Sequence, residues 1–156
     1  MIRVLLLPVL AALAVVPAAA GYAESPAAVC AKVGTNDALT PIPADLVPAV
    51  NAAFGTRMPP DMAVATVVFR CAGGHVLVCT AGANLPCGPA NTSRTPGTGA
   101  VTWCREHPSD DSIPAVATGH DTVFLWRCQG DNPRVVQRIQ AIDPRGFIAA
   151  YWQRLN

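Results

Sequence analysis

The chain has 156 residues, of which 51% are hydrophobic, and its 11 basic and 10 acidic residues leave a formal net charge of +1 at pH 7. This length is that of one domain that buries roughly two-thirds of its unfolded surface. A net charge so close to zero argues against nucleic acid or an anionic membrane as the partner.

The N-terminus has the pattern of a secretory signal peptide. Arg3 supplies a positive start, Val4 to Val16 is almost wholly apolar, and small residues follow. Cleavage after Ala23 is expected, and cleavage after Ala20 is the alternative. The apolar run is shorter than the roughly 20 residues of a membrane-spanning helix, so we expect no stable membrane insertion of the mature chain.

All six cysteines follow this leader, in the predicted single domain, residues 24–156. An even number of cysteines behind a signal peptide indicates an oxidising compartment and disulfides whose pairing stays open at this point. We therefore expect a periplasmic or secreted protein. The disulfide candidates are Cys30, Cys71, Cys79, Cys87, Cys104 and Cys128.

The first part of the domain is predicted to contain one helix. Residues 24–43 are turn-rich and are expected to be an extended entry segment. A helix is predicted from Asp45 to Gly55, because its large apolar residues fall on one face. Residues 57–61, which include two adjacent prolines, are expected to be a stiff connector.

A β-hairpin is predicted around Gly73-Gly74, a strong two-residue turn signal between two β-branched runs. Because strand side chains alternate, Cys71 and Cys79 project from opposite faces of this hairpin and do not bond to one another. Cys79 can reach Cys87 across the next loop, whereas Cys71 needs a partner elsewhere. The runs are 64–71 and 75–81.

The second half is predicted to hold another hairpin and a final helix. Residues 100–104 are expected to be a short strand between two polar loops. The alternating runs 121–129 and 134–142 are expected to pair. Asp143-Pro144 is a typical helix start, and an apolar stripe follows it. The predicted fold class is therefore α+β: a small antiparallel sheet of two hairpins with a helix before and a helix after, stapled by disulfides.

A cluster of histidines and acids suggests a metal site, but a plain solvated turn explains the same residues. The cluster has no standard zinc spacing, and we predict neither a metal nor a cofactor. No catalytic residue is assigned, because the cysteines are expected to be paired and the serines lie in loop-like sequence without a nucleophile elbow. The residues in this cluster are His107, Asp110, Asp111, His120 and Asp121.

We expect a small disulfide-stabilised cell-envelope module that binds or inhibits an unknown protein or envelope ligand. Its contact surface is placed in the loops 82–99 and 105–120, which are long and polar. The alternative is a small periplasmic hydrolase or metal-dependent enzyme that uses residues 105–121, and a structural or stress-related protein is a further class. The candidate binding residues are Asn84, Arg105, His107, His120 and Arg127.

Four segments carry a resemblance to a known group: RCAGGHVLVCTAGANLPCG, WCREHP, IPAVATGHDTVFLWRC and DPRGFIAAYWQRL. The chain resembles small secreted, cysteine-containing proteins of alphaproteobacteria, which implies the compartment and the disulfides and supplies no catalytic residue. An aromatic-Arg-Cys strand and a later Trp-bearing strand are also similar, in topology alone, to periplasmic inhibitors of C-type lysozyme.

Overall fold

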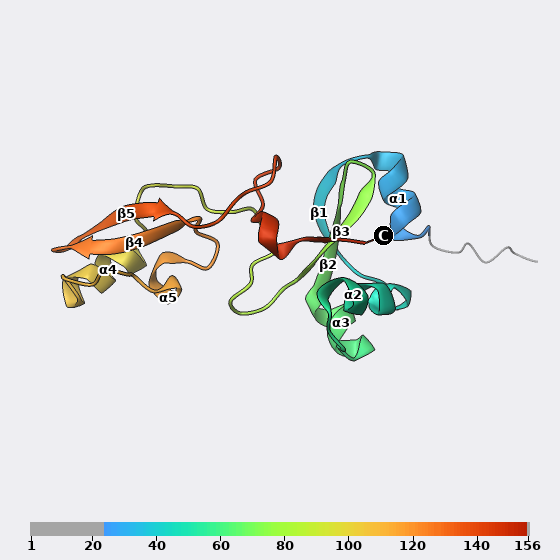
Figure 1. Cartoon of the computed structure of the whole chain (residues 1–156), viewed down its shortest axis with the longest axis horizontal. Coiled ribbons are helices and arrows are strands. Elements are labelled where there is room, and N and C mark those ends of the chain that lie inside the picture. Colours follow the sequence, from blue (N-terminus) through green and yellow to red (C-terminus); the bar gives the residue numbers. More distant parts are fainter. Residues whose placement is uncertain (1–23, 156) are drawn as a thin grey trace, which may run out of the picture.

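The computed structural model describes residues 24–155, and the predicted signal peptide, 1–23, lies outside the described residues. The chain forms two lobes side by side, one around a four-stranded sheet and one around a two-stranded hairpin (Figure 1). The elements are α1 (Pro26–Val33), β1 (Asn36–Pro41), η1 (Ala44–Leu46), α2 (Val47–Phe54), α3 (Pro60–Thr66), β2 (Val67–Ala72), β3 (His75–Thr80), α4 (Thr98–Glu106), α5 (Ala115–Thr118), β4 (Phe124–Gln129), β5 (Asn132–Arg138), η2 (Ala149–Tyr151) and β6 (Gln153–Arg154).

The larger lobe contains an antiparallel sheet with the strand order β1-β2-β3-β6. β2 and β3 form the predicted hairpin, in which six consecutive residues of β2 pair with six consecutive residues of β3. Gly73 and Gly74 occupy the turn with φ values of 58° and 82°. Glycine has no side chain to clash at positive φ, which is why this dipeptide fixes the turn and the register.

The two cysteines of this hairpin lie in different parts of the core, on opposite faces of the hairpin as predicted. Cys71 is bonded to Cys30 of α1 and is buried among the apolar residues between the sheet and the helices. Cys79 is bonded to Cys87 and belongs to a separate small cluster. Strand alternation therefore assigns the two disulfides to opposite sides of one hairpin.

In the larger lobe, two helices form where the sequence predicts none. α1 occupies the expected extended entry: the Ser25 hydroxyl accepts a hydrogen bond from the backbone N–H of Ala28 at 3.3 Å, and Pro26 starts the helix. α3 begins at Pro60, inside the expected connector, and ends at Thr66. Proline fits the first turn because that N–H has no partner within the helix. The prediction of an extended entry is therefore wrong at 26–33, where α1 forms, but β1 (Asn36–Pro41) is extended as expected. The prediction of a stiff connector is wrong from Pro60 onward.

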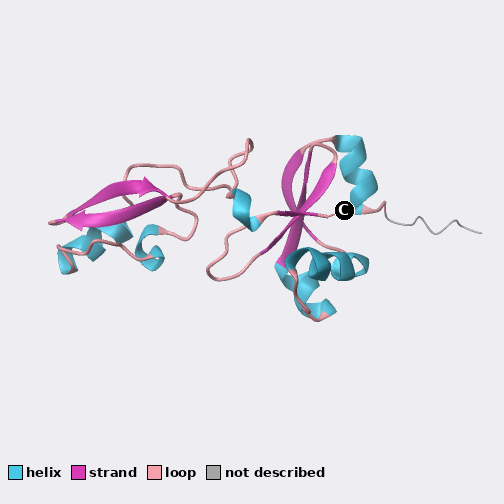
Figure 2. Cartoon of the chain, viewed as in Figure 1, coloured by secondary structure: helices cyan, strands magenta, loops and turns pink. Residues whose placement is uncertain are grey.

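The smaller lobe is the second predicted hairpin, β4–β5, which forms a sheet of its own. The two hairpins are thus not parts of one continuous sheet. α4 and α5 lie on one face of β4–β5 (Figure 2). α4 replaces the short strand expected at 100–104, because Ala100 and Cys104, four residues apart, share one buried helical face. Cys104 is bonded to Cys128 of β4.

Within the described residues, which end at 155, the segment after β5 contains no α-helix and finishes in a short strand. η2 is a single 3-10 turn, after which β6 pairs with β3 at Leu77 and Val78. The apolar residues that were expected to form one helical stripe lie in two different clusters. Phe147 packs against Trp152 near Cys79–Cys87, whereas Ile148 lies in the core of the smaller lobe. Residues that bury in two directions cannot share one helical face, so the predicted final helix does not form.

The α+β class, the antiparallel hairpins and the three disulfides are confirmed. Within residues 24–155, no helix has the length and apolarity that crossing a bilayer requires. Three disulfides in a chain of this size indicate folding in an oxidising compartment.

Candidate functional site

Two of the five candidate binding residues meet in one place. Asn84 and His120 line the same cavity of about 280 Å³, which we call the junction crevice. Arg105 and His107 are exposed at the end of α4, and Arg127 is exposed on β4. The structure therefore divides the predicted set into three locations.

The junction crevice is built from segments that are far apart in the sequence. Its walls combine polar and apolar side chains in about equal share. Asn84 follows β3, whereas most of the other lining residues belong to the smaller lobe and Tyr151 belongs to η2. The lining residues are Asn84, Ser112, Ile113, Pro114, Ala115, Thr118, Gly119, His120, Thr122, Phe124, Leu125, Ile139, Gln140 and Tyr151.

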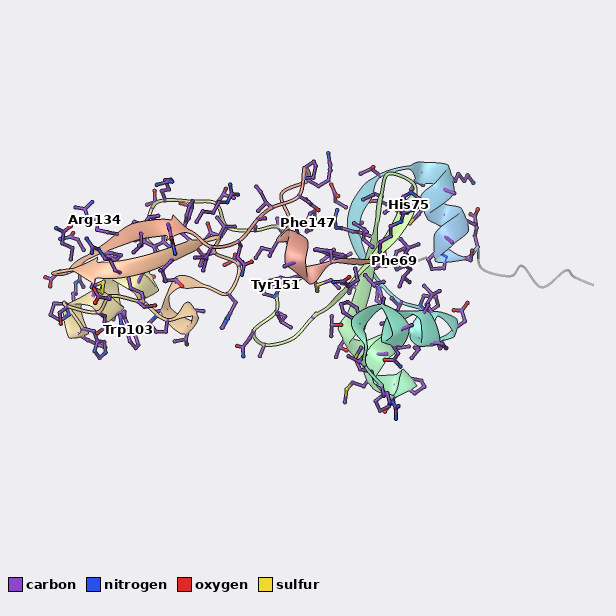
Figure 3. All side chains as sticks on the ribbon, in the orientation of Figure 1. Phe69, His75, Trp103, Arg134, Phe147 and Tyr151 are labelled. Carbon is purple, nitrogen blue, oxygen red and sulfur yellow. A yellow bond between two sulfur atoms is a disulfide. The ribbon has the colours of Figure 1, made fainter. Side chains whose placement is uncertain are left out.

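Tyr151, the last residue of η2, lies at the meeting point of the two lobes, where Figure 3 labels it. Its side chain packs against the core of the smaller lobe and also against the cluster around Cys79–Cys87. It lines the junction crevice and an adjoining groove of about 370 Å³ that contains Phe54, Met58 and Leu85. The crevice and the groove are therefore neighbours that share one aromatic residue.

A disulfide-closed loop carries Asn84 to this site. The Cys79–Cys87 bond spans eight positions of sequence, and a bridge between Gly82 and Leu85 tightens the loop tip. Asn84 faces the junction crevice, while its neighbour Leu85, 44% exposed, faces the groove. A short covalent loop of this kind loses little conformational entropy when it binds.

His120 is positioned by the glycine that precedes it. Gly119 ends α5 with φ 93°, and a Cβ atom at this position would lie 2.6 Å from Oδ1 of Asp121. Only glycine fits, so the chain turns sharply and brings His120 to the crevice wall. Within residues 24–155, the side chains of Asn84, His120 and Gln140 make no hydrogen bond to another residue.

The suspected metal cluster does not assemble. His107 stacks on Trp103 with 4.4 Å between ring centroids, and the Trp103 indole N–H donates to Asp110 at 2.9 Å. These contacts lie at the outer end of the smaller lobe, where Figure 3 labels Trp103, whereas His120 lines the junction crevice. Across the described residues, 24–155, no three His, Cys, Asp or Glu side chains gather in a group that could hold a metal ion.

Sequence analysis missed the most deeply buried charge among the described residues, 24–155. Arg70 of β2 is 1% exposed, and its guanidinium carbon lies 4.1 Å from the ring centroid of Phe147 and 4.5 Å from that of Trp152. Its terminal nitrogens donate to Asp143 and, at 3.4 Å, to Asp37. We call these five residues the Arg70 clamp, because they join β1, β2 and the C-terminal segment.

A second, exposed arginine completes this ion-pair network. Arg145 donates two hydrogen bonds to Asp37, at 2.8 and 2.5 Å, and the contact raises the pKa of Arg145. Asp143 is supported from the other side by the backbone N–H groups of Phe147 and Arg145. The only sequence signal for this network was an arginine inside an otherwise apolar strand.

The pKa of Asp143 lies below its ordinary value of 3.8. Burial alone would raise it, but the backbone N–H groups of Phe147 and Arg145, together with the Arg70 guanidinium, stabilise the carboxylate and lower it. Folding therefore gains stability from ionised Asp143 above pH 3.8 and loses that gain as the pH falls below this value.

Asp143→Asn is accordingly expected to make the free energy of unfolding depend less on pH in the acid range. Urea unfolding at a series of pH values from neutral to below 3.8 should show a smaller loss of unfolding free energy in the variant than in the wild type. Asp61→Asn, on exposed α3, is the matched control and should keep the wild-type slope. An unchanged slope in Asp143→Asn would show that this carboxylate does not contribute to the acid response.

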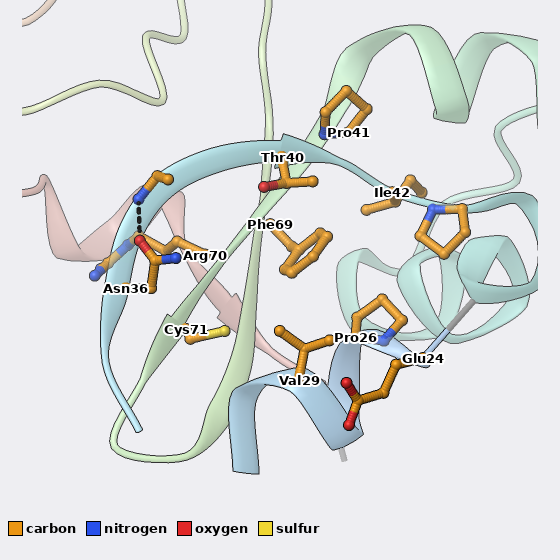
Figure 4. Close-up of a pocket in the computed structure, with 12 residues that line it drawn as sticks. Glu24, Pro26, Val29, Asn36, Thr40, Pro41, Ile42, Phe69, Arg70 and Cys71 are labelled. Atoms are coloured by element: carbon orange, nitrogen blue, oxygen red, sulfur yellow. Dashed lines mark hydrogen bonds between the residues drawn. The ribbon is translucent and has the colours of Figure 1, made fainter. Parts of the chain in front are cut away.

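A further cavity, of about 410 Å³, lies between α1 and β1 (Figure 4). Val29, Ile42 and Phe69 provide much of its apolar wall, and Glu24 stands at the start of the described chain beside it. It contains none of the five candidate binding residues. Of the cavities described here, the junction crevice is the one that contains two of these residues, Asn84 and His120.

Compared with known protein families, with curated proteins and with solved structures, the chain has no match in any of the three.

Proposed function

We propose that this protein is a binding or inhibitor-like module of the cell envelope, periplasmic or secreted, whose protein partner contacts the junction crevice. The observation that carries the proposal is the convergence of Asn84, His120 and Tyr151, from three distant segments, on one partly apolar cavity. Cavities placed between packed units of a fold are typical ligand sites.

The architecture around the crevice supports recognition of a partner. The Cys79–Cys87 loop presents Asn84 to the crevice and Leu85 to the adjoining groove, so a partner can meet polar and apolar contacts side by side. Protein interfaces likewise combine apolar and polar contacts. Three disulfides keep the surface preorganised outside the cell, where the predicted leader would direct the chain.

Site-specific photo-crosslinking tests this proposal. A photoreactive amino acid at position 84 should crosslink to one discrete envelope protein in the source organism. The same amino acid at Lys32, exposed on α1 of the larger lobe, is the control. Crosslinking from position 84 but not from position 32, abolished by His120→Ala, is the expected result. Equal crosslinking from both positions would refute a partner site at the crevice.

A further inference from the structure

The β4–β5 hairpin leaves one face uncovered. Its buried pairs, which include Trp126 with Val135, point toward α4, and the alternate residues point away. Figure 2 shows both helices of this lobe on one side of the hairpin. We call the opposite side the outer face. Its residues are Leu125, Arg127, Gln129, Asn132, Arg134 and Gln137, with Val136 beside a bulge.

Two arginines stand directly opposite one another on the outer face. Arg127 pairs with Arg134 across the two strands, and both side chains are exposed. Like charges in facing positions of a hairpin cost stability. Among residues 24–155 the ion pairs all belong to Arg70 and Arg145, so neither guanidinium on this face is neutralised by an acid of the chain.

Three of the other five residues on the outer face carry amide side chains, and Leu125 and Val136 are apolar. Gln129 faces Asn132 at the turn end, and Gln137 lies at the other end of the same strand pair. Amide side chains both donate and accept hydrogen bonds, as sugar hydroxyls do. Guanidinium groups bind carboxylates through two parallel hydrogen bonds. No Asp or Glu occurs among the seven residues of this face.

We propose that the outer face binds a carboxylate-bearing glycan. The carboxylate bridges Arg127 and Arg134, and the flanking amides bind hydroxyl groups of the sugar units on either side. The charge complementarity and the hydroxyl-matching amides both favour this ligand. An anionic bilayer fits less well, because two arginines on a chain of nearly zero net charge attract it weakly.

This inference goes beyond the proposed function, because it concerns a second surface with its own ligand. The outer face adjoins the junction crevice only through Leu125. Variants of Asn84 or His120 should therefore leave glycan binding unchanged, and variants of the arginine pair should leave crosslinking from position 84 unchanged. The failure of one proposal can thus be told apart from the failure of the other.

The test uses the full mature chain and an oligouronate as the probe, with binding measured by calorimetry or by affinity electrophoresis. The wild type should bind the oligouronate, should bind more weakly at high salt, and should not bind a neutral oligoglucan. Arg127→Gln and Arg134→Gln should each weaken binding by about tenfold. Arg57→Gln, which removes an exposed arginine from the larger lobe, is the matched control and should bind as the wild type does.

The same variants report on folding. Removing one member of a like-charge pair should leave the thermal unfolding midpoint unchanged or raise it by about 2 °C. Weaker binding in a variant that is as stable as the wild type cannot be a folding defect. The proposal is overturned if the wild type does not bind the oligouronate, if Arg57→Gln loses as much affinity as Arg127→Gln, or if polyglutamate binds more tightly than the glycan.

Discussion

Replacing Arg70 by methionine is expected to lower the free energy of unfolding by about 3–5 kcal/mol. The substitution keeps much of the side-chain volume but removes the charge between Asp37 and Asp143, whose side chains are 27% and 19% exposed. Each carboxylate then loses its buried partner, and two aromatic rings lose a cation. Denaturant unfolding followed by tryptophan fluorescence measures the change.

Arg145→Met is the control for this prediction. Arg145 contacts the same Asp37, but its side chain is 55% exposed, and exposed ion pairs contribute little. Its loss of stability should therefore be much smaller than that of Arg70→Met. Equal losses in the two variants would mean that the burial of Arg70, and with it the clamp as described, does not determine stability.

Replacing Cys104 and Cys128 together by alanine is expected to cost about 3 kcal/mol and to affect mainly the smaller lobe. This disulfide closes 24 positions of sequence and joins α4 to β4. The lobe has only a two-stranded sheet and a small buried cluster, so little else holds α4 in place. Hydrogen exchange should show faster opening in β4 and β5 than in β2 and β3.

The double replacement of Cys79 and Cys87 provides the comparison. It opens a loop of only eight positions and should cost less, about 2–3 kcal/mol, because shorter loops restrict the unfolded chain less. Hydrogen exchange in this double variant should become faster around Asn84, while the amides of β4 and β5 stay protected. Hydrogen exchange that became equally faster in both lobes, in either double variant, would show that each disulfide does not stabilise its own lobe independently.

Sequence analysis identified the features that depend on local geometry. The Gly73-Gly74 turn fixed a register, and the register placed Cys71 and Cys79 on opposite faces, which is what the disulfides show. The alternation in β4 identified a strand with one apolar face. Turn chemistry and strand periodicity act over a few residues, so one sequence is sufficient to detect them.

Features that depend on distant contacts could not be obtained this way. Nothing near Arg70 indicates that Phe147 and Trp152 cover it, because the chain must fold before these rings reach β2. The same holds for Tyr151, whose place in the crevice depends on an irregular C-terminal segment. The helices that begin at Pro26 and Pro60 were not predicted for another reason. Proline can be the first residue of a helix as well as interrupt one, so its presence does not show which occurs.

The affinity of the partner crosslinked at position 84, measured for the wild type and for His120→Ala, tests the central claim most directly. His120 lines the junction crevice, so its replacement removes a contact without touching the disulfides or the Arg70 clamp. The claim predicts at least about tenfold weaker binding with an unchanged unfolding midpoint. An equal affinity for both proteins would contradict it.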